Sequence, residues 1–214
     1  MKIISVNISL PKKVKWKEMT VLTSIFKEPV HHRTEIKFLN VEGDGQADLT
    51  VHGGAEKAVY AYAAEHYDAW KQELHDHRMP FGMFGENLTI GGGLFEKDIL
   101  VGDRFRFGTA ELMAVQPRQP CYKLGIRFGD AGIIKKFMQS RRYGIYFKVL
   151  KEGNVQEGDP AEKIGPSPDH GISIADIGRL LLEMDRDNSI LQRAVQIEFL
   201  PENLRLHFHR LLQS

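Results

Sequence analysis

The sequence predicts a mainly β fold, a β-barrel with a few inserted helices, followed by a small C-terminal three-helix domain. Residues 1–165 alternate short β-rich runs with turns rich in glycine, proline and aspartate, which is typical of a barrel or a sandwich. Residues 166–214 instead carry apolar residues at helical spacing. We place the boundary between the two predicted domains, 1–165 and 166–214, at the linker-like run Gly165–Pro168.

Six strands and two helices are predicted in the first domain. The shorter helix is expected over Ile133–Met138, and the longer one, Ala64–Leu74, places Tyr67, Trp70 and Leu74 at helical spacing. The strands are expected where β-branched and aromatic residues gather between turn residues, at Ile3–Ile8, Thr34–Phe38, Asn87–Ile90, Arg104–Phe107, Glu111–Val115 and Ile145–Leu150.

The second domain carries three helix starts. Ser173 with Asp176 three residues later resembles a capping box, in which each side chain satisfies a backbone N–H of the first turn. Asn188 can cap a second helix, and Pro201 opens a third. Each helix then carries apolar residues along one face, so we expect the three to pack on one another.

Composition excludes several classes of function. The chain has 29 Lys and Arg against 28 Asp and Glu, without the basic excess of a nucleic-acid-binding protein. No apolar run is long enough to span a bilayer, and the N-terminus alternates polar and apolar residues, unlike a signal peptide. We therefore expect a soluble cytoplasmic protein that binds neither nucleic acid nor membranes. A single cysteine excludes an internal disulfide framework and an iron–sulfur cluster held by four thiolates of this chain.

That cysteine, Cys121, lies in the most informative segment, Gln116–Leu124. A lone cysteine is most often a small buried hydrophobe. Here two prolines stiffen the approach, while Arg118 and Lys123 bring positive charge, which favours the thiolate form of a cysteine. A thiolate is a soft ligand suited to softer metal centres. The residues alone leave open whether Cys121 is a metal ligand or a catalytic nucleophile.

Two further segments contain glycine turns. In the first, Gly53 and Gly54 allow backbone N–H groups to face an anion, and Lys57 adds a point charge suited to phosphate. The Gly-x-x-x-x-Gly-Lys-Ser/Thr spacing of a Walker A loop is absent. The plainer alternative is an ordinary turn in which His52 bonds to the backbone.

In the second, Phe84–Gly93, the Asn87 amide offers a donor and an acceptor, and Glu86 can accept from a heterocycle N–H. The plainer alternative here is a tight turn before a strand, with a flexible glycine exit.

Together these motifs resemble the MOSC domain, named for the C-terminal domain of molybdenum cofactor sulfurases. The pattern consists, in order, of Val51–Gly54 with Lys57–Tyr60, then Gly85–Leu88, then Pro120-Cys121. The chain is most similar to the bacterial stand-alone branch that reduces N-hydroxylated compounds, including hydroxylaminopurine-type bases. That branch shares the stretches Gly43–Asp48 and Gly144–Gly153 and a small helical C-terminal domain. Arg141 departs from it, because a glycine is expected there, in a Ser-Gly-Arg-like turn.

The resemblance implies a MOSC-type β-barrel and a molybdenum cofactor, Mo-molybdopterin, which is a pterin dithiolene with a terminal phosphate. It implies that Cys121 ligates molybdenum and is catalytic. The cofactor would be bound by the residues of the three motifs, namely His52, Gly53, Gly54, Lys57, Glu86, Asn87 and Arg118. The glycine loop and Lys57 suit the phosphate, and Glu86 and Asn87 suit the pterin edges.

The implied function is the reduction of small N-hydroxylated substrates to amines by a molybdenum-cofactor-dependent oxidoreductase. Because the chain cannot hold its own iron–sulfur relay, a separate flavoprotein or ferredoxin-type electron donor is expected. The alternative is a non-catalytic carrier of the cofactor, or of sulfur, that uses Cys121, and a third interpretation is a cofactor-free cysteine transferase. The oligomeric state stays open, with a homodimer among the options.

Overall fold

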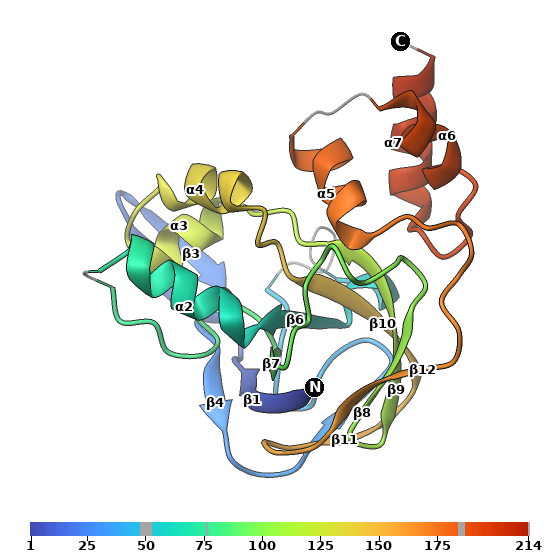
Figure 1. Cartoon of the computed structure of the whole chain (residues 1–214). Coiled ribbons are helices and arrows are strands. Elements are labelled where there is room, and N and C mark those ends of the chain that lie inside the picture. The colour runs from blue at the N-terminus through green and yellow to red at the C-terminus, as the bar shows by residue number, and fades with distance from the viewer. Residues whose placement is uncertain (48–52, 76, 184–186, 214) are drawn as a thin grey trace.

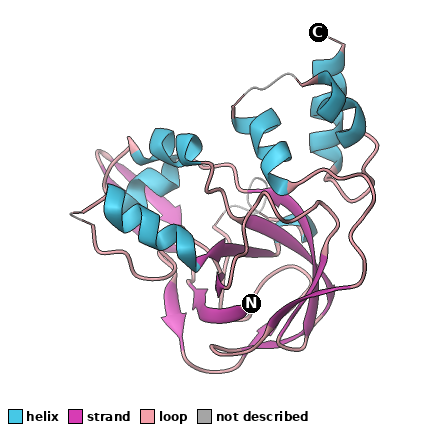
Figure 2. Ribbon diagram, viewed as in Figure 1, coloured by secondary structure: helices cyan, strands magenta, loops and turns pink. Residues whose placement is uncertain are grey.

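The computed structural model describes residues 1–47, 53–75, 77–183 and 187–213 (Figure 1). A curled sheet lies at the centre, one group of helices covers part of it, and a second group follows at the C-terminal end (Figure 2). The strands are β1 Lys2–Ile8, β2 Lys12–Trp16, β3 Met19–Thr23, β4 Glu28–Val30, β5 Thr34–Ile36, β6 Val59–Ala63, β7 Leu88–Gly91, β8 Arg104–Phe107, β9 Ala110–Pro117, β10 Ile145–Lys151, β11 Gly153–Val155 and β12 Ala161–Ile164. The helices are the short 3-10 turn η1 Ala55–Lys57, then α2 Ala64–Glu73, α3 Tyr122–Phe128, α4 Ile133–Ser140, α5 Ile174–Leu182, α6 Asn188–Ala194 and α7 Glu202–Leu212.

The main sheet has eight strands in the order β12-β8-β9-β10-β6-β7-β1-β4. Its neighbouring strands are antiparallel except for β6 and β7, which run parallel. The sheet curls until its two ends approach each other, with Ile3 N donating to the Asp159 carbonyl and Ala161 N donating to the Met1 carbonyl.

The predicted closed barrel is not formed by the described strands, in which β12 and β4 remain the sheet edges. The physical reason lies in β1, because Lys2–Val6 pair with β7 on one side and Val6–Ile8 pair with β4 on the other. Only the first residues of β1 are left for β12, where one isolated bridge joins Lys2 to Pro160. The prediction of a mainly β fold is corrected as well, because the described residues form six α-helices, which makes this a mixed, sheet-rich fold.

Two apolar cores hold these layers together. One fills the concave side of the curled sheet and continues into the C-terminal helices, including Phe105, Phe147, Ile177 and Leu191. The other lies under α2–α4 and is largely aromatic, with Tyr62, Tyr67, Trp70, Phe84 and Phe137 fully buried. The aromatic core fixes the helical layer that borders the site described below.

The three predicted C-terminal helices are present as α5, α6 and α7 (Figure 1). The capping box at Ser173 forms with both of its hydrogen bonds to Asp176. The second helix is capped one residue earlier than predicted, by Asp187, whose side chain accepts from Ser189 N and Ile190 N. Residues of α5 share the apolar core of the sheet. The division into two domains at residue 165 stays a prediction.

Arg141, where a glycine was expected, ends α4 in the left-handed conformation with a φ of 60°. A glycine adopts this conformation without steric cost, which explains the expectation. Across the described ranges, none of the helices combines the length and apolar character needed to cross a membrane.

Candidate functional site

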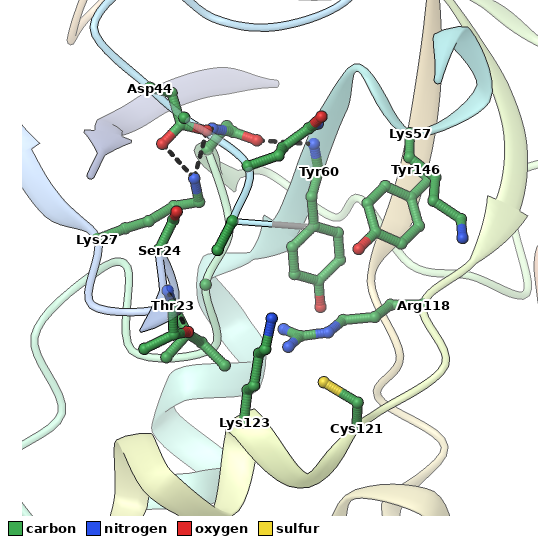
Figure 3. Close-up of a pocket in the computed structure, with 16 residues that line it drawn as sticks. Thr23, Ser24, Lys27, Asp44, Lys57, Tyr60, Arg118, Cys121, Lys123 and Tyr146 are labelled. Atoms are coloured by element: carbon green, nitrogen blue, oxygen red, sulfur yellow. Dashed lines mark hydrogen bonds and ion pairs between the residues drawn. The ribbon is translucent and has the colours of Figure 1, made fainter. Parts of the chain in front are cut away.

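A pocket with an empty volume of about 600 Å³ opens beside Cys121 at one end of the sheet (Figure 3). Its walls come from segments far apart in the sequence. The end of β3 and the following loop supply 23–25 and Lys27, the loop before η1 supplies 44–47, and β6, β10 and α3 contribute one residue each. Tertiary folding therefore brings the cysteine motif and the two glycine motifs to the same place.

Cys121 immediately precedes α3, where it adopts an extended conformation, with φ of −125° and ψ of 171°. The chain leaves β9 at Pro117, and Pro120 then restricts the backbone just before the cysteine. The cysteine is half-buried, and Figure 3 shows its sulfur lying with Arg118 and Lys123. A thiol in this position is accessible from the pocket and lies next to positive charge.

Arg118 is the central cation of the pocket, and only 6% of its surface is exposed. Its guanidinium carbon lies 5.0 Å from the ring centroid of Tyr60, and its Nη1 is buried without a hydrogen-bond partner in the described structure. Burial works against the charge, but Tyr60 and the other polar neighbours in the pocket outweigh it and raise the arginine pKa, so the guanidinium stays charged. A buried cation with an unpartnered donor is costly in isolation, so this position suits an anionic ligand.

Three lysines add to this positive character. Lys27 is buried and forms an ion pair with Asp44; burial lowers its pKa, and Asp44 opposes the shift. Lys57 is half-buried, and burial lowers its pKa as well, against the nearby Glu56. Lys123 completes the set. Among the described lining residues, four cations face a single carboxylate, which is already paired, so the pocket favours an anion.

The structure brings four of the sequence-predicted site residues together: Lys57, Asn87, Arg118 and Cys121 all line the pocket. The Asn87 amide, however, is used by the protein itself. Its Oδ1 accepts from Tyr60 N at 3.1 Å, and its Nδ2 donates to Asp44 Oδ2 at 2.9 Å. Asn87 therefore holds the base of the pocket in place, and this commitment leaves little of its amide for a ligand.

Glu86 does not line the pocket, and its side chain is fully buried. Its carboxylate accepts from the Tyr67 hydroxyl, the Thr89 hydroxyl and two backbone N–H groups of the preceding loop. Burial raises the Glu86 pKa, while these hydrogen bonds work in the opposite direction. The residue organises the loop that carries Gly85 and Asn87, rather than facing the space where a ligand would lie.

The glycine loop is described only in part. Gly54 has a φ of 99°, and its carbonyl accepts from Lys57 N at 3.0 Å, which forms η1 and orients Lys57. Gly53 and Gly54 are not among the residues lining the pocket. His52 lies outside the described residues.

Several lining residues were not among the predicted site residues. Lys27 carries no motif signal, since it is an isolated lysine after an apolar run. Asp44 belongs to the stretch Gly43–Asp48 that the resemblance includes, but it was not assigned to the site. Tyr60 and Tyr146 lie on adjacent strands with ring centroids 5.0 Å apart, and burial raises the pKa of each phenol, so both remain protonated.

Metal binding by protein groups alone is not supported in the described part of the chain. It contains no group of three or more His, Cys, Asp or Glu residues placed to hold a metal ion.

Comparison with known proteins agrees with this geometry. The family model described as the MOSC domain matches residues 48–162. The chain is 36% identical over 206 residues to the uncharacterized protein YflK of Bacillus subtilis, covering 96% of this chain and 92% of that protein. It is 32% identical over 146 residues to a protein of Gibberella moniliformis named "Reductase", covering 65% of this chain but only 25% of that protein. The crystal structure of YiiM from Geobacillus stearothermophilus superposes with a TM-score of 0.81 and 31% identity, covering 99% of this chain and 98% of that one.

Proposed function

The chain belongs to the MOSC domain family, and on that premise we propose that it is an oxidoreductase that holds the molybdenum cofactor at Cys121. Its reaction is the reduction of N-hydroxylated compounds, such as hydroxylaminopurine-type bases, to amines. The observation that carries the proposal is the buried, unpartnered Nη1 of Arg118, beside the thiol in a pocket with four cations. The relative named "Reductase" supports the same class of chemistry.

The residues present fit this cofactor. The Cys121 sulfur offers one soft ligand to the metal, and Arg118, Lys57 and Lys123 offer charged donors to phosphate and other anionic oxygens. When bound, the cofactor supplies two-electron redox chemistry at a metal, while the protein supplies orientation and electrostatics. Lys27 is paired with Asp44 and therefore shapes the pocket wall more than it neutralises a ligand.

The reaction balances as R–NHOH + 2 e⁻ + 2 H⁺ → R–NH₂ + H₂O. The N–O bond breaks, one N–H and one O–H bond form, and the two electrons come from a separate flavoprotein or ferredoxin-type donor.

The test combines elemental analysis with turnover. Protein made in a molybdenum-replete host should contain near-stoichiometric molybdenum and should reduce N-hydroxylaminopurine when a chemical reductant replaces the natural donor. Molybdenum without turnover would indicate the carrier alternative. Turnover of a cysteine-transfer substrate by molybdenum-free protein would indicate the transferase.

A further inference from the structure

A second hollow, with an empty volume of about 590 Å³, borders Cys121. Cys121, Lys57 and Tyr146 line both this hollow and the cationic pocket. The thiol therefore lies at the boundary between two spaces. A group held at Cys121 from the cationic side would be accessible from the second hollow.

The two spaces differ in chemistry. The cationic pocket contains four basic side chains, whereas Lys57 is the one charged residue among the described residues that line the second hollow. The rest of that lining consists of Cys121, two prolines, Tyr146 and three amides, Gln116, Gln119 and Asn203. An anionic cofactor suits the first space, and a neutral, planar molecule with hydrogen-bonding edges suits the second.

We propose that the second hollow is the substrate pocket, and that Gln119 and Asn203 determine its specificity for N-hydroxylated heterocyclic bases; this rests on the proposed function. A side-chain amide presents a donor and an acceptor side by side, which matches the ring edges of a purine that stay free when its N–OH group faces Cys121. Tyr146 and the prolines offer flat apolar surfaces to the ring. In this arrangement the N–OH group points toward Cys121.

The three amides are not equivalent. Gln116 is buried, and its Nε2 donates to the Glu56 carbonyl at 3.2 Å, so it supports the wall. Gln119 and Asn203 are exposed and can turn toward a ligand. These two are therefore the residues to which we assign base recognition.

Asn203 comes from the first turn of α7, whereas the MOSC family model matches residues 48–162 only. In Figure 1 the C-terminal end of α7 points away from the sheet, so its first turn lies at the end nearer the sheet. The C-terminal helices thus complete a pocket that the matched segment forms only in part. This gives those helices a role in substrate selection.

The test measures selectivity. The kcat/KM for N-hydroxylaminopurine is divided by that for hydroxylamine, which has no ring edge, in wild type, Asn203→Leu and Gln119→Leu. Each variant should lower this ratio about tenfold, because one amide-to-base contact is lost, through a higher KM for the base. Gln192→Leu, which removes an exposed amide on α6 away from the hollow, is the matched control and should leave the ratio unchanged.

Binding of the same base, measured by calorimetry, separates this inference from the proposed function. If the wild-type protein binds the base but does not reduce it, and both variants bind the base more weakly, the assignment of the pocket stands and the proposed reductase activity is rejected. Wild-type affinity and wild-type selectivity in both variants, at equal molybdenum content, would overturn the assignment of the pocket.

Discussion

Replacement of Arg118 by methionine should lower cofactor retention without a comparable loss of stability. Methionine fills a similar length without charge. The buried, unpartnered Nη1 costs the cofactor-free protein about 1–3 kcal/mol, whereas the cation–π contact with Tyr60 at 5.0 Å contributes up to about 2 kcal/mol. The unfolding free energy of the cofactor-free variant should therefore lie between a loss of about 1 kcal/mol and a gain of about 3 kcal/mol.

Cofactor retention should fall, because a charge-assisted hydrogen bond contributes about 1.5–3 kcal/mol, or roughly a 10- to 100-fold change in affinity. The assay is urea denaturation of protein from a host unable to make the cofactor, together with molybdenum analysis of protein from a replete host. A loss of more than about 2 kcal/mol in the cofactor-free protein, with molybdenum content unchanged, would show that Arg118 is a structural anchor and would refute the reasoning.

Three other outcomes are expected. Cys121→Ser should abolish both molybdenum retention and turnover, because a hard hydroxyl replaces a soft ligand. The melting temperature should change little, because the position is half-buried. Wild-type turnover per bound molybdenum would contradict this. Arg141→Gly should stabilise the fold by about 0.5–1 kcal/mol in urea titration, because it relieves a φ of 60°, and the exposed ion pair that it removes with Glu183 contributes little. Burial lowers the pKa of Lys57 in the folded protein below its ordinary value of 10.5, so between the two pKa values the unfolded chain binds more protons than the folded one. The unfolding free energy should therefore rise with pH across this alkaline window. If Lys57→Met shows the same dependence on pH, Lys57 is not its source.

The strands that were predicted and those that were missed differ in one physical property. Arg104–Phe107 was predicted with its observed bounds, because its residues alternate between exposed and buried. Val59–Ala63 was missed, because every residue of β6 is buried and no alternation marks it. The hairpin of β2 and β3 was missed for another reason, since its lysine-rich first strand carries few of the residues that favour strands.

Whether the sheet closes into a barrel could not be predicted from the sequence pattern either. Whether a curled sheet closes depends on which partners the edge strands find, and β1 is shared between β7 and β4. Nothing in the alternation of residues within β1 specifies that second partner, because strand pairing is a long-range choice.

The sequence by itself determined the chemistry available to this protein: one thiol with the cations Arg118 and Lys123 near it in the chain, Lys57 in a glycine motif, and the motifs of the MOSC family. Residue type alone carries that information. Only the tertiary structure decided which groups remain available to a ligand. It committed the Asn87 amide to Tyr60 and Asp44, turned Glu86 into a loop anchor, and brought Asn203 to the second hollow. These outcomes depend on contacts between segments that are distant in the chain, and no local pattern specifies them.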